Sequence, residues 1–348
     1  MNEKIKNLIE KLKNKNKLSV DDFQYVLENY TKEDFDYIKD IASKIAIENF
    51  GKKIYFRGII EFSNICKNDC LYCGIRRSND NVERYRLTLD QILECCAEGY
   101  EYGYRTFVLQ SGEDGHFNDE TMVNVVSSIR EKYKDFAITL SIGERSRESY
   151  KKLFDAGANR FLLRHEAANK ELYEKIHPSS QSWEERFRCL RDLKDIGYQV
   201  GAGMMIGVPY QTLRNIAEDL VFIQDFNPHM VGIGPFIPHK DTPFREEKAG
   251  SIEISLLTLS LVRIMLPKVL LPSTTALGSL DGEGRKQGVL HGCNVIMPNL
   301  SPMSVRKKYL LYDNKAGIEN DAKTSIDILR KQMEEIGYEV VVTRGDYN

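Results

Sequence analysis

The residues most able to do chemistry are three cysteines, Cys66, Cys70 and Cys73, which follow one another in the spacing C-x3-C-x2-C. Thiolates are the ligands of iron–sulfur clusters, and three of them on one short loop can hold three irons of a cubane while the fourth iron stays open. A zinc loop is the alternative. Structural zinc takes four protein ligands, however, and the next cysteine along the chain is Cys95. The spacing therefore predicts a [4Fe–4S] cluster with one iron free to bind another molecule.

Composition limits the kinds of partner. The chain has 348 residues, 42% of them hydrophobic, and a formal net charge of −2 at pH 7. This is enough apolar material for a large core, and the charge argues against a nucleic-acid surface. No apolar run approaches the roughly 20 residues of a membrane span, and the first residues read as an amphipathic helix. We expect a cytoplasmic protein with a small-molecule substrate, no nucleic acid and no membrane.

The other cysteines fit the same setting. The chain has 7 cysteines, an odd number without even spacing, which is typical of a reducing compartment. The four outside the loop are predicted to be buried thiols that pack as small apolar residues. They are Cys95, Cys96, Cys189 and Cys293.

The hydrophobic pattern predicts an α/β scaffold for the cysteine loop. Apolar positions recur at helical spacing from about residue 3 to 50, with Ser19 and Thr31 as helix N-caps. From residue 54 onward, short β-rich runs alternate with stretches long enough for the crossover helices that parallel strands need. The predicted strands are 54–62, 106–111, 137–142, 160–166, 199–206, 230–237, 271–275 and 294–297, and the predicted crossover helices are 89–101, 120–132, 147–154, 183–194, 216–224 and 252–265.

Eight such units predict a (β/α)8 TIM-type barrel at 51–312, after an N-terminal helical extension at 1–50. The C-terminal segment, 313–348, is expected to close the far end of the barrel with a helix near 325–336 and a strand near 339–343. In such barrels the reacting groups lie on loops at the carboxyl ends of the strands. Each predicted strand ends in a polar or Gly/Pro cluster, beginning with the cysteine loop and then 110–114. We therefore expect these clusters to meet at one rim.

The cysteine loop, with the aromatic Tyr72 before its last cysteine, resembles the signature of the radical S-adenosylmethionine (SAM) superfamily. Within it the chain resembles the branch that contains biotin synthase, methylornithine synthase and the [FeFe]-hydrogenase maturase family HydE, and most of all HydE. The similarity covers about residues 54 to 312. The runs that carry it are 60–64, 108–114, 160–166, 230–239 and 294–299.

The resemblance implies two cofactors, a [4Fe–4S] cluster on the three cysteines and SAM on the open iron. A guanidinium at Arg186 can fork onto the SAM carboxylate, although a solvated surface charge is the alternative for an arginine on a helix. The stretch 203–207, which has glycine at both ends, is expected to offer a flat backbone edge to adenine. The implied SAM-binding residues are Tyr72, Gln110, Ser111, Gly112, Glu113, Ser141, Glu166, Arg186, Met205 and Ile237.

An anion is expected inside the barrel. Arg160 and Arg164 lie four apart on one predicted strand, so they share a face, and a buried arginine needs an anionic partner. That partner is either the substrate or a structural ion pair with Glu166 or Glu144. His165 alternates with the two arginines and is predicted to pack in the helix layer. The substrate residues implied by the resemblance are Thr139, Arg160, Arg164, Met230, Thr274, Thr275, Met297, Tyr309 and Tyr312.

The HydE resemblance also implies a reaction. A 5′-deoxyadenosyl radical from SAM would act on a small organometallic substrate, a cysteine-ligated Fe(CO)2(CN) unit from the maturase HydG, toward the diiron subsite of the hydrogenase H-cluster delivered to HydF. An external ferredoxin- or flavodoxin-type donor would supply the electron. Some HydE members carry a second cluster, but residues 313–348 contain no cysteine, so none is expected here. Two alternatives stay open: a methylornithine synthase-like mutase acting on an amino acid, and a non-catalytic iron–sulfur scaffold or carrier.

Overall fold

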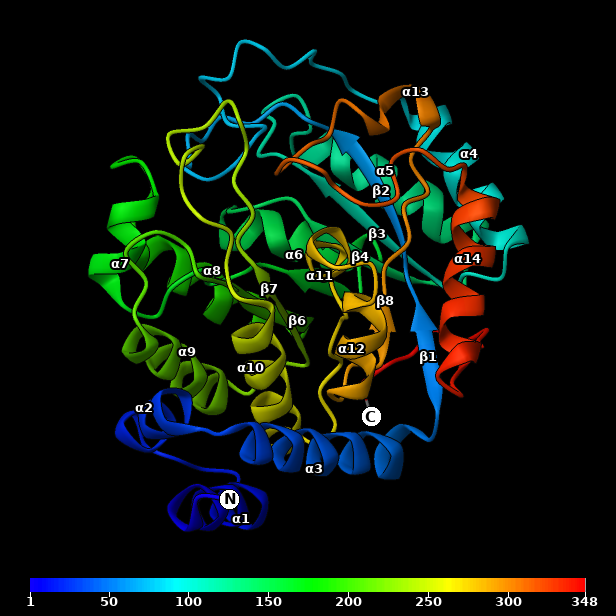
Figure 1. The fold of residues 1–348 in the computed structure, drawn as a ribbon. Helices are drawn as coiled ribbons and strands as arrows, with labels where there is room; N and C mark the ends of the chain where they lie inside the picture. The colour runs from blue at the N-terminus through cyan, green and yellow to red at the C-terminus, as the bar shows by residue number, and fades with distance from the viewer. Residues whose placement is uncertain (348) are drawn as a thin grey trace.

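The computed structural model describes residues 1–347 and contains a curved parallel sheet surrounded by helices (Figure 1). Strands that are neighbours in the sheet also follow one another in sequence, as helical crossovers require. A second parallel set has β1 (Lys53–Phe56) between β8 (Val295–Ile296) and β9 (Glu339–Val341). The strands of the larger sheet are β2 (Gly58–Ser63), β3 (Thr106–Ser111), β4 (Ala137–Ser141), β5 (Arg160–Leu162), β6 (Gln199–Ile206) and β7 (Met230–Pro235).

Single parallel bridges close the strands into a ring. The segment 270–272 fills the seventh position next to β7, and β8 fills the eighth. The predicted (β/α)8 barrel is therefore confirmed, with its seventh strand reduced to isolated bridges. The closing bridges join Met230 to Leu270, Pro272 to Val295, and Ile59 to Asn299.

Three predicted strands differ from the structure. The seventh, 271–275, is irregular because Pro272 has no N–H to give to a ladder, and helix α11 (Thr275–Leu280) begins at its last residue. The fourth ends at Leu162, because Glu166 has a left-handed backbone (φ +63°) that a regular strand does not adopt. The first is broken at Arg57, where the chain changes partners from β8 and β9 to β3.

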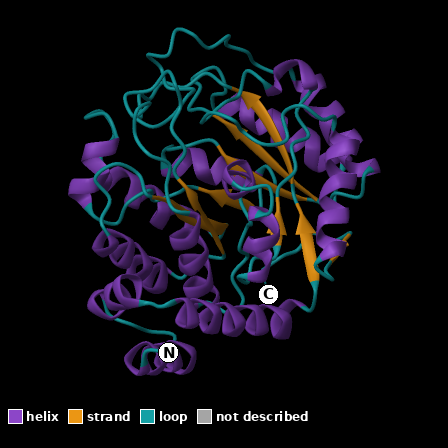
Figure 2. Ribbon diagram, viewed as in Figure 1, coloured by secondary structure: helices purple, strands orange, loops and turns teal. Residues whose placement is uncertain are grey.

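The crossover helices match the predicted stretches to within three residues at each end. They lie on the outside of the strands, and long loops gather at the top of the view (Figure 2). The short helix α7 (Lys170–Ile176) lies between two of them in sequence, and the short helix α12 (Gly284–Leu290) follows the last of them. The crossover helices are α4 (Leu89–Glu101), α5 (Asp119–Lys132), α6 (Arg147–Asp155), α8 (Trp183–Ile196), α9 (Leu213–Phe226) and α10 (Ile252–Met265).

The N-terminal extension is three helices, α1 (Glu3–Lys15), α2 (Val20–Asn29) and α3 (Lys32–Phe50). The predicted caps are confirmed, because Ser19 and Thr31 each form a capping box. Helix α2 packs on α9 and α3 packs on α10, at the end of the barrel away from the long loops (Figure 1). No helix within residues 1–347 is both long and apolar enough to cross a membrane.

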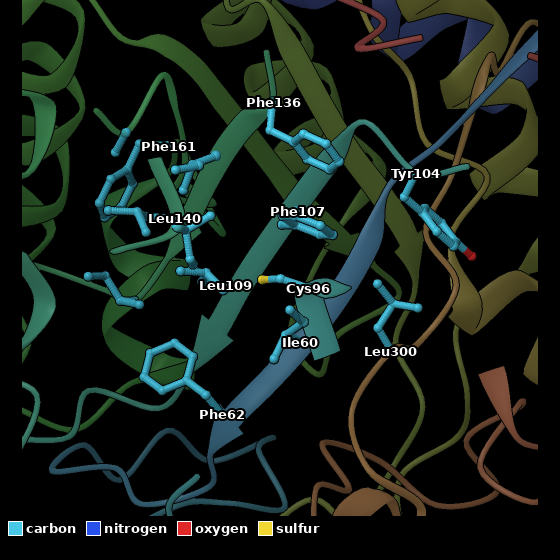
Figure 3. Packing of buried hydrophobic residues seen from close by; sticks show 14 of the residues in the cluster. Ile60, Phe62, Cys96, Tyr104, Phe107, Leu109, Phe136, Leu140, Phe161 and Leu300 are labelled. Carbon is cyan, nitrogen blue, oxygen red and sulfur yellow. The ribbon is translucent and has the colours of Figure 1, made fainter. Parts of the chain in front are cut away.

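The main core lies between the sheet and helices α4, α5, α6 and α8, and Ile326, Leu329 and Met333 of the C-terminal segment pack into it. Figure 3 shows Phe107 of β3 against Phe136, with ring centroids 4.5 Å apart, and Cys96 of α4 among the aliphatic side chains. Burying one such large side chain stabilises the fold by about 2 kcal/mol. The four cysteines outside the loop are all buried and free, as predicted.

The C-terminal segment forms helix α14 (Ala322–Glu335) and strand β9, close to the two predicted elements. Its last residues reach into the barrel floor. Arg160 donates to the carbonyls of Arg344 and Gly345 at 3.0 and 3.1 Å and pairs with Asp346 at 2.6 Å. Arg57 also donates to the Gly345 carbonyl, at 3.4 Å. The tail thus provides acceptors for two buried guanidinium groups at the end opposite the cysteine loop, although Arg57 Nε has no partner among the described residues.

The burial of His291 predicts that the contact between the N-terminal extension and the barrel weakens in acid. The ring is 1% exposed, lies 2.8 Å from the Ser260 hydroxyl and packs on Phe35. Burial, and then the charge of Lys39, lower the pKa of His291 to about 4. The unfolded chain protonates near pH 6.5 and the folded one does not, so stability is full above pH 6.5 and falls toward pH 4.

We expect His291→Asn, which keeps a hydrogen-bonding group near Nδ1, to remove about 2 kcal/mol of the stability lost between pH 7.5 and pH 5. Urea unfolding of the apoprotein at pH 7.5 and 5 checks it. His177 and His229 also have lowered pKa values, so some slope persists in the variant. Equal slopes in both proteins would contradict the assignment to His291.

Candidate cluster and cofactor site

Hydrogen bonds to backbone carbonyl groups hold the cysteine loop at the rim of the barrel. Arg84 donates to four of them, at 2.6–3.0 Å. At the start of the loop, Ser63 donates to the buried carboxylate of Asp114 at 2.7 Å, and Arg86 pairs with the same carboxylate. These contacts set the path of the loop without any metal. The carbonyls that Arg84 binds are those of Asn64, Ile75, Arg76 and Asn79.

The three thiols line one cavity of about 360 Å³ at the mouth of the barrel. Burial raises the pKa of all three, to about 12 for Cys73, so each holds its proton until a cation displaces it. Within residues 1–347, no three His, Cys, Asp or Glu side chains converge closely enough to hold a single ion. A cubane instead takes each thiolate on a different iron.

Gly112 lets the end of β3 pass close to the cysteine loop. A Cβ at this position would lie 2.4 Å from the Ile65 carbonyl oxygen and 2.7 Å from the Cys66 Cβ. The N–H of Glu113 lies 3.4 Å from the Cys66 sulfur. The predicted 110–113 segment therefore touches the cysteine loop as well as the cavity.

Charged side chains form a connected row along the rim. Lys67 of the cysteine loop lies 3.0 Å from Glu113, whose other oxygen accepts the Glu144 N–H at 3.0 Å. Glu144 accepts from Arg186 at 2.6 Å; burial raises the pKa of Glu144 and Arg186 counters the rise. Arg186 also donates to the Arg164 carbonyl at 2.6 Å and is only 6% exposed. Its reading as a solvated surface charge is wrong.

Glu166 enters the cavity from a left-handed backbone, which costs a non-glycine residue about 1–2 kcal/mol. The buried carboxylate of Asp219 on α9 holds both sides of this bend. It accepts the Ala168 N–H at 2.6 Å and lies 3.3 Å from His165 Nε2. His165 is fully buried, as predicted. The Glu166 carboxylate lies 3.0 Å from Arg164 Nη2.

Tyr72 is held by a histidine that the sequence did not single out. Its hydroxyl lies 3.0 Å from His177 Nε2, and His177 Nδ1 lies 2.9 Å from the Tyr173 carbonyl. A carbonyl only accepts, so Nδ1 carries the proton and Tyr72 donates to Nε2. Burial, and then the charge of Arg186, lower the pKa of His177 to about 3, which keeps the ring neutral.

Gly203, in the stretch expected to face adenine, lies against the neighbouring strand. A Cβ on Gly203 would lie 2.0 Å from the Gly232 carbonyl oxygen, so glycine at 203 serves the close approach of β6 to β7. Gly232 and Gly234 of β7 line the cavity instead, together with Met205 and Ile237.

The predicted cofactor residues all come together. Tyr72, Gln110, Ser111, Gly112, Glu113, Ser141, Glu166, Arg186, Met205 and Ile237 line the cavity.

The predicted substrate residues divide into two groups. One group lines the same cavity, whereas Arg160, Thr139 and Met230 are buried beneath it, with Thr139 and Arg160 paired in register. Arg160 makes a structural ion pair, with Asp346 in place of Glu166 or Glu144, and Met230 accepts from Arg57. The side chains at the cavity are Arg164, Thr274, Thr275, Met297, Tyr309 and Tyr312.

Sequence reasoning missed a buried ion pair in the cavity wall. The ammonium of Lys315 pairs with Glu61 of β2 and donates to the Tyr309 carbonyl at 3.0 Å. Asn299 donates to the other oxygen of Glu61 at 2.8 Å. A charged residue within an otherwise apolar strand signals Glu61, but Lys315 lies in a segment without periodicity and gives no such signal.

The cavity suits a polar, zwitterionic ligand. Among the described residues, Thr274 Oγ1, Glu166 Oε2 and Arg164 Nη2 are buried without a hydrogen bond, although the last two lie within ion-pair distance. Buried polar atoms without partners are costly, so a bound molecule is expected to satisfy them. SAM offers an amino group, a carboxylate and ribose hydroxyls to such atoms. The residues present therefore fit both a cluster on three thiols and SAM beside it.

The chain is also similar to known proteins that belong to the radical SAM superfamily. The family model described as the radical SAM superfamily matches residues 60–223. The [FeFe] hydrogenase maturase subunit HydE of Thermotoga maritima is 43% identical over 297 residues, which cover 85% of this chain and 84% of that protein. The 3-methylornithine synthase of Methanosarcina acetivorans is 28% identical over 92% of this chain and 90% of its own.

Two solved structures share the fold. The methylornithine synthase PylB superposes with a TM-score of 0.82 and 26% identity, covering 96% of this chain and 97% of its own. The hydrogenase maturase HydG superposes with a TM-score of 0.83 at 20% identity, covering 98% of this chain and 76% of its own. At that identity, HydG supports the fold alone.

A closed parallel barrel with a three-cysteine loop at its rim defines a class of enzyme, and the chain belongs to the radical SAM superfamily. Within the superfamily it belongs to the family of the maturase HydE, as 43% identity over most of both chains shows.

Gly112 provides a test of the loop contact. We expect Gly112→Ala to push the cysteine loop outward, because the new Cβ has no space. After anaerobic reconstitution, the iron bound per protein should fall at least about threefold, which is equivalent to a loss of about 0.7 kcal/mol in binding free energy. Iron and sulfide analysis measures it. Gly115→Ala is the matched control on the same loop, since a Cβ there meets nothing within 4 Å. Equal iron content in both variants would show that the contact does not matter.

Proposed function

We propose that this chain is a HydE-type maturase. Its substrate would be a small organometallic molecule, a cysteine-ligated Fe(CO)2(CN) unit, and its product a precursor of the diiron subsite of the [FeFe]-hydrogenase H-cluster. One observation carries the proposal: the three thiols open into one cavity that also contains unsatisfied polar groups, in a chain 43% identical to HydE. The partners would be HydG, HydF and an external ferredoxin- or flavodoxin-type donor.

Each part of the cavity has a separate task in this proposal. When bound, the [4Fe–4S] cluster and SAM would supply a 5′-deoxyadenosyl radical by one-electron cleavage of the sulfonium. Cys66, Cys70 and Cys73 hold the cluster. Arg186, fixed by Glu144, and the bent Glu166 would bind the polar groups of SAM through charge-assisted hydrogen bonds.

The inner end of the cavity would take the substrate. Arg164 supplies a positive charge there, and Thr274 supplies a hydroxyl that has no partner within residues 1–347. Tyr309 and Tyr312 also line the cavity, Tyr309 buried and Tyr312 partly buried; burial raises the pKa of Tyr312 to about 12, so its hydroxyl stays protonated as a donor.

The proposal predicts three measurable results. Anaerobically reconstituted, dithionite-reduced protein should give a cubane EPR signal that SAM perturbs, and it should form 5′-deoxyadenosine. The chain should also replace HydE in a cell-free maturation of apo-hydrogenase with HydG and HydF. Cys70→Ala should abolish all of these, whereas Cys293→Ala, a buried thiol outside the loop, should leave them intact.

The outcomes separate the alternatives. Cleavage of SAM without hydrogenase maturation, and with turnover of an amino acid, would favour a mutase. A cubane signal that SAM does not perturb would favour a scaffold or carrier.

The contacts of Arg186 predict that its substitution weakens SAM binding and leaves the cluster intact. Arg186→Lys keeps the charge but cannot bond both Glu144 and the Arg164 carbonyl, so we expect SAM affinity to fall about tenfold, or about 1.4 kcal/mol. Equilibrium dialysis with SAM measures it, and iron content should be unchanged. Arg188→Lys, on the same helix among surface carboxylates, is the control. Equal SAM affinities would exclude this role.

A further inference from the structure

The sulfurs of the cysteine loop differ in their hydrogen-bond donors. Cys66 receives the Glu113 N–H at 3.4 Å. The Cys66 sulfur thus lies against a backbone amide, a donor that no side-chain substitution removes.

Cys70 lies against a side chain instead. Within residues 1–347, the hydrogen bond that reaches its sulfur is the one with the Gln181 amide, at 3.0 Å. Gln181 is 5% exposed and lines the cavity beside the cysteine loop. A buried amide directed at a cluster ligand is a specific arrangement, because glutamine is mostly exposed in folded proteins.

The loop between α7 and α8 fixes Gln181 in this place. Its own N–H donates to the Pro178 carbonyl at 2.9 Å. The same loop binds the cysteine loop twice more, through the Ile176 carbonyl, which accepts the Leu71 N–H at 3.1 Å, and through His177. Gln181 therefore keeps its position relative to Cys70 without help from a cofactor.

Loading iron reverses the direction of this hydrogen bond. In the thiol, Cys70 donates to Gln181 Oε1. A sulfur bound to iron has no proton, so it can only accept. A half-turn of the terminal amide exchanges Oε1 for Nε2 at nearly the same position and presents an N–H to the sulfur.

We propose that Gln181 donates a hydrogen bond to the Cys70 sulfur in the cluster-loaded enzyme and thereby raises the reduction potential of the cluster. The inference rests on the proposed function, since it needs a cluster on Cys70. An N–H at sulfur withdraws electron density and so favours the reduced cluster. Gln181 is thus a positioning and tuning residue, in contact with a cluster ligand, that sets how strong a reductant the enzyme needs.

The test is an EPR-monitored redox titration of the reconstituted cluster without SAM. Gln181→Leu removes the donor and should shift the one-electron equilibrium about tenfold against the reduced form, which is about 59 mV more negative. Gln181→Glu, of nearly the same shape but without an N–H, should shift it further. Gln211→Leu is the control, because that amide binds the backbone of Met205 and Gly207 and no sulfur.

Each outcome decides a separate point. Unchanged potentials in both Gln181 variants, with intact clusters, would overturn the inference and leave the proposed function standing. A wild-type protein that forms no cubane would overturn both. If the variants do not retain a cluster, pulsed EPR of the wild-type cluster with side-chain ¹⁵N-labelled glutamine decides: a hyperfine coupling to ¹⁵N supports the hydrogen bond, and its absence excludes it.

Discussion

The structure of this site depends on one constraint: three thiols must be held in a fixed arrangement inside a cavity of low polarity. Burial alone would keep them protonated, as their raised pKa values indicate. The loop that carries them has no regular secondary structure, so its shape comes from Arg84 and its four carbonyl contacts. The conformational entropy of the loop is thus lost during folding, so a cluster that binds later finds its ligands already in place.

The rim charges solve a related problem. Glu113, Glu144 and Arg186 are largely shielded from water, where an unpaired charge is costly. They form a connected row that reaches the more exposed Arg164: Glu113 accepts the Glu144 N–H, Glu144 pairs with Arg186, and Arg186 donates to the Arg164 carbonyl. Such a row keeps polar groups available to a ligand while remaining stable without one. Some of the buried atoms without a hydrogen bond, such as Thr274 Oγ1, lie at the cavity and mark where a ligand is expected.

The two ends of the barrel have different tasks. At the rim, loops of different length bring together residues far apart in sequence, as is usual at the carboxyl ends of barrel strands. At the floor, the C-terminal tail meets Arg57 and Arg160 and leaves them bonded within the protein. Arg160 lies on β5, whereas Arg164 lies beyond the end of that strand at Leu162, so the first belongs to the floor and the second to the cavity.

Local patterns in the sequence predicted the cluster-binding cysteine loop and the α/β barrel that carries it. The spacing of Cys66, Cys70 and Cys73 is local, and hydrophobic periodicity is local too, so both can be read without knowing the fold. Only the tertiary structure decided which residues meet across long separations. Lys315 with Glu61, Asp346 with Arg160 and Gln181 with Cys70 are such pairs, and no short-range pattern encodes them. A charged or polar group that is buried away from water needs a hydrogen-bonding or ionic partner, and the fold decides which residue lies beside it.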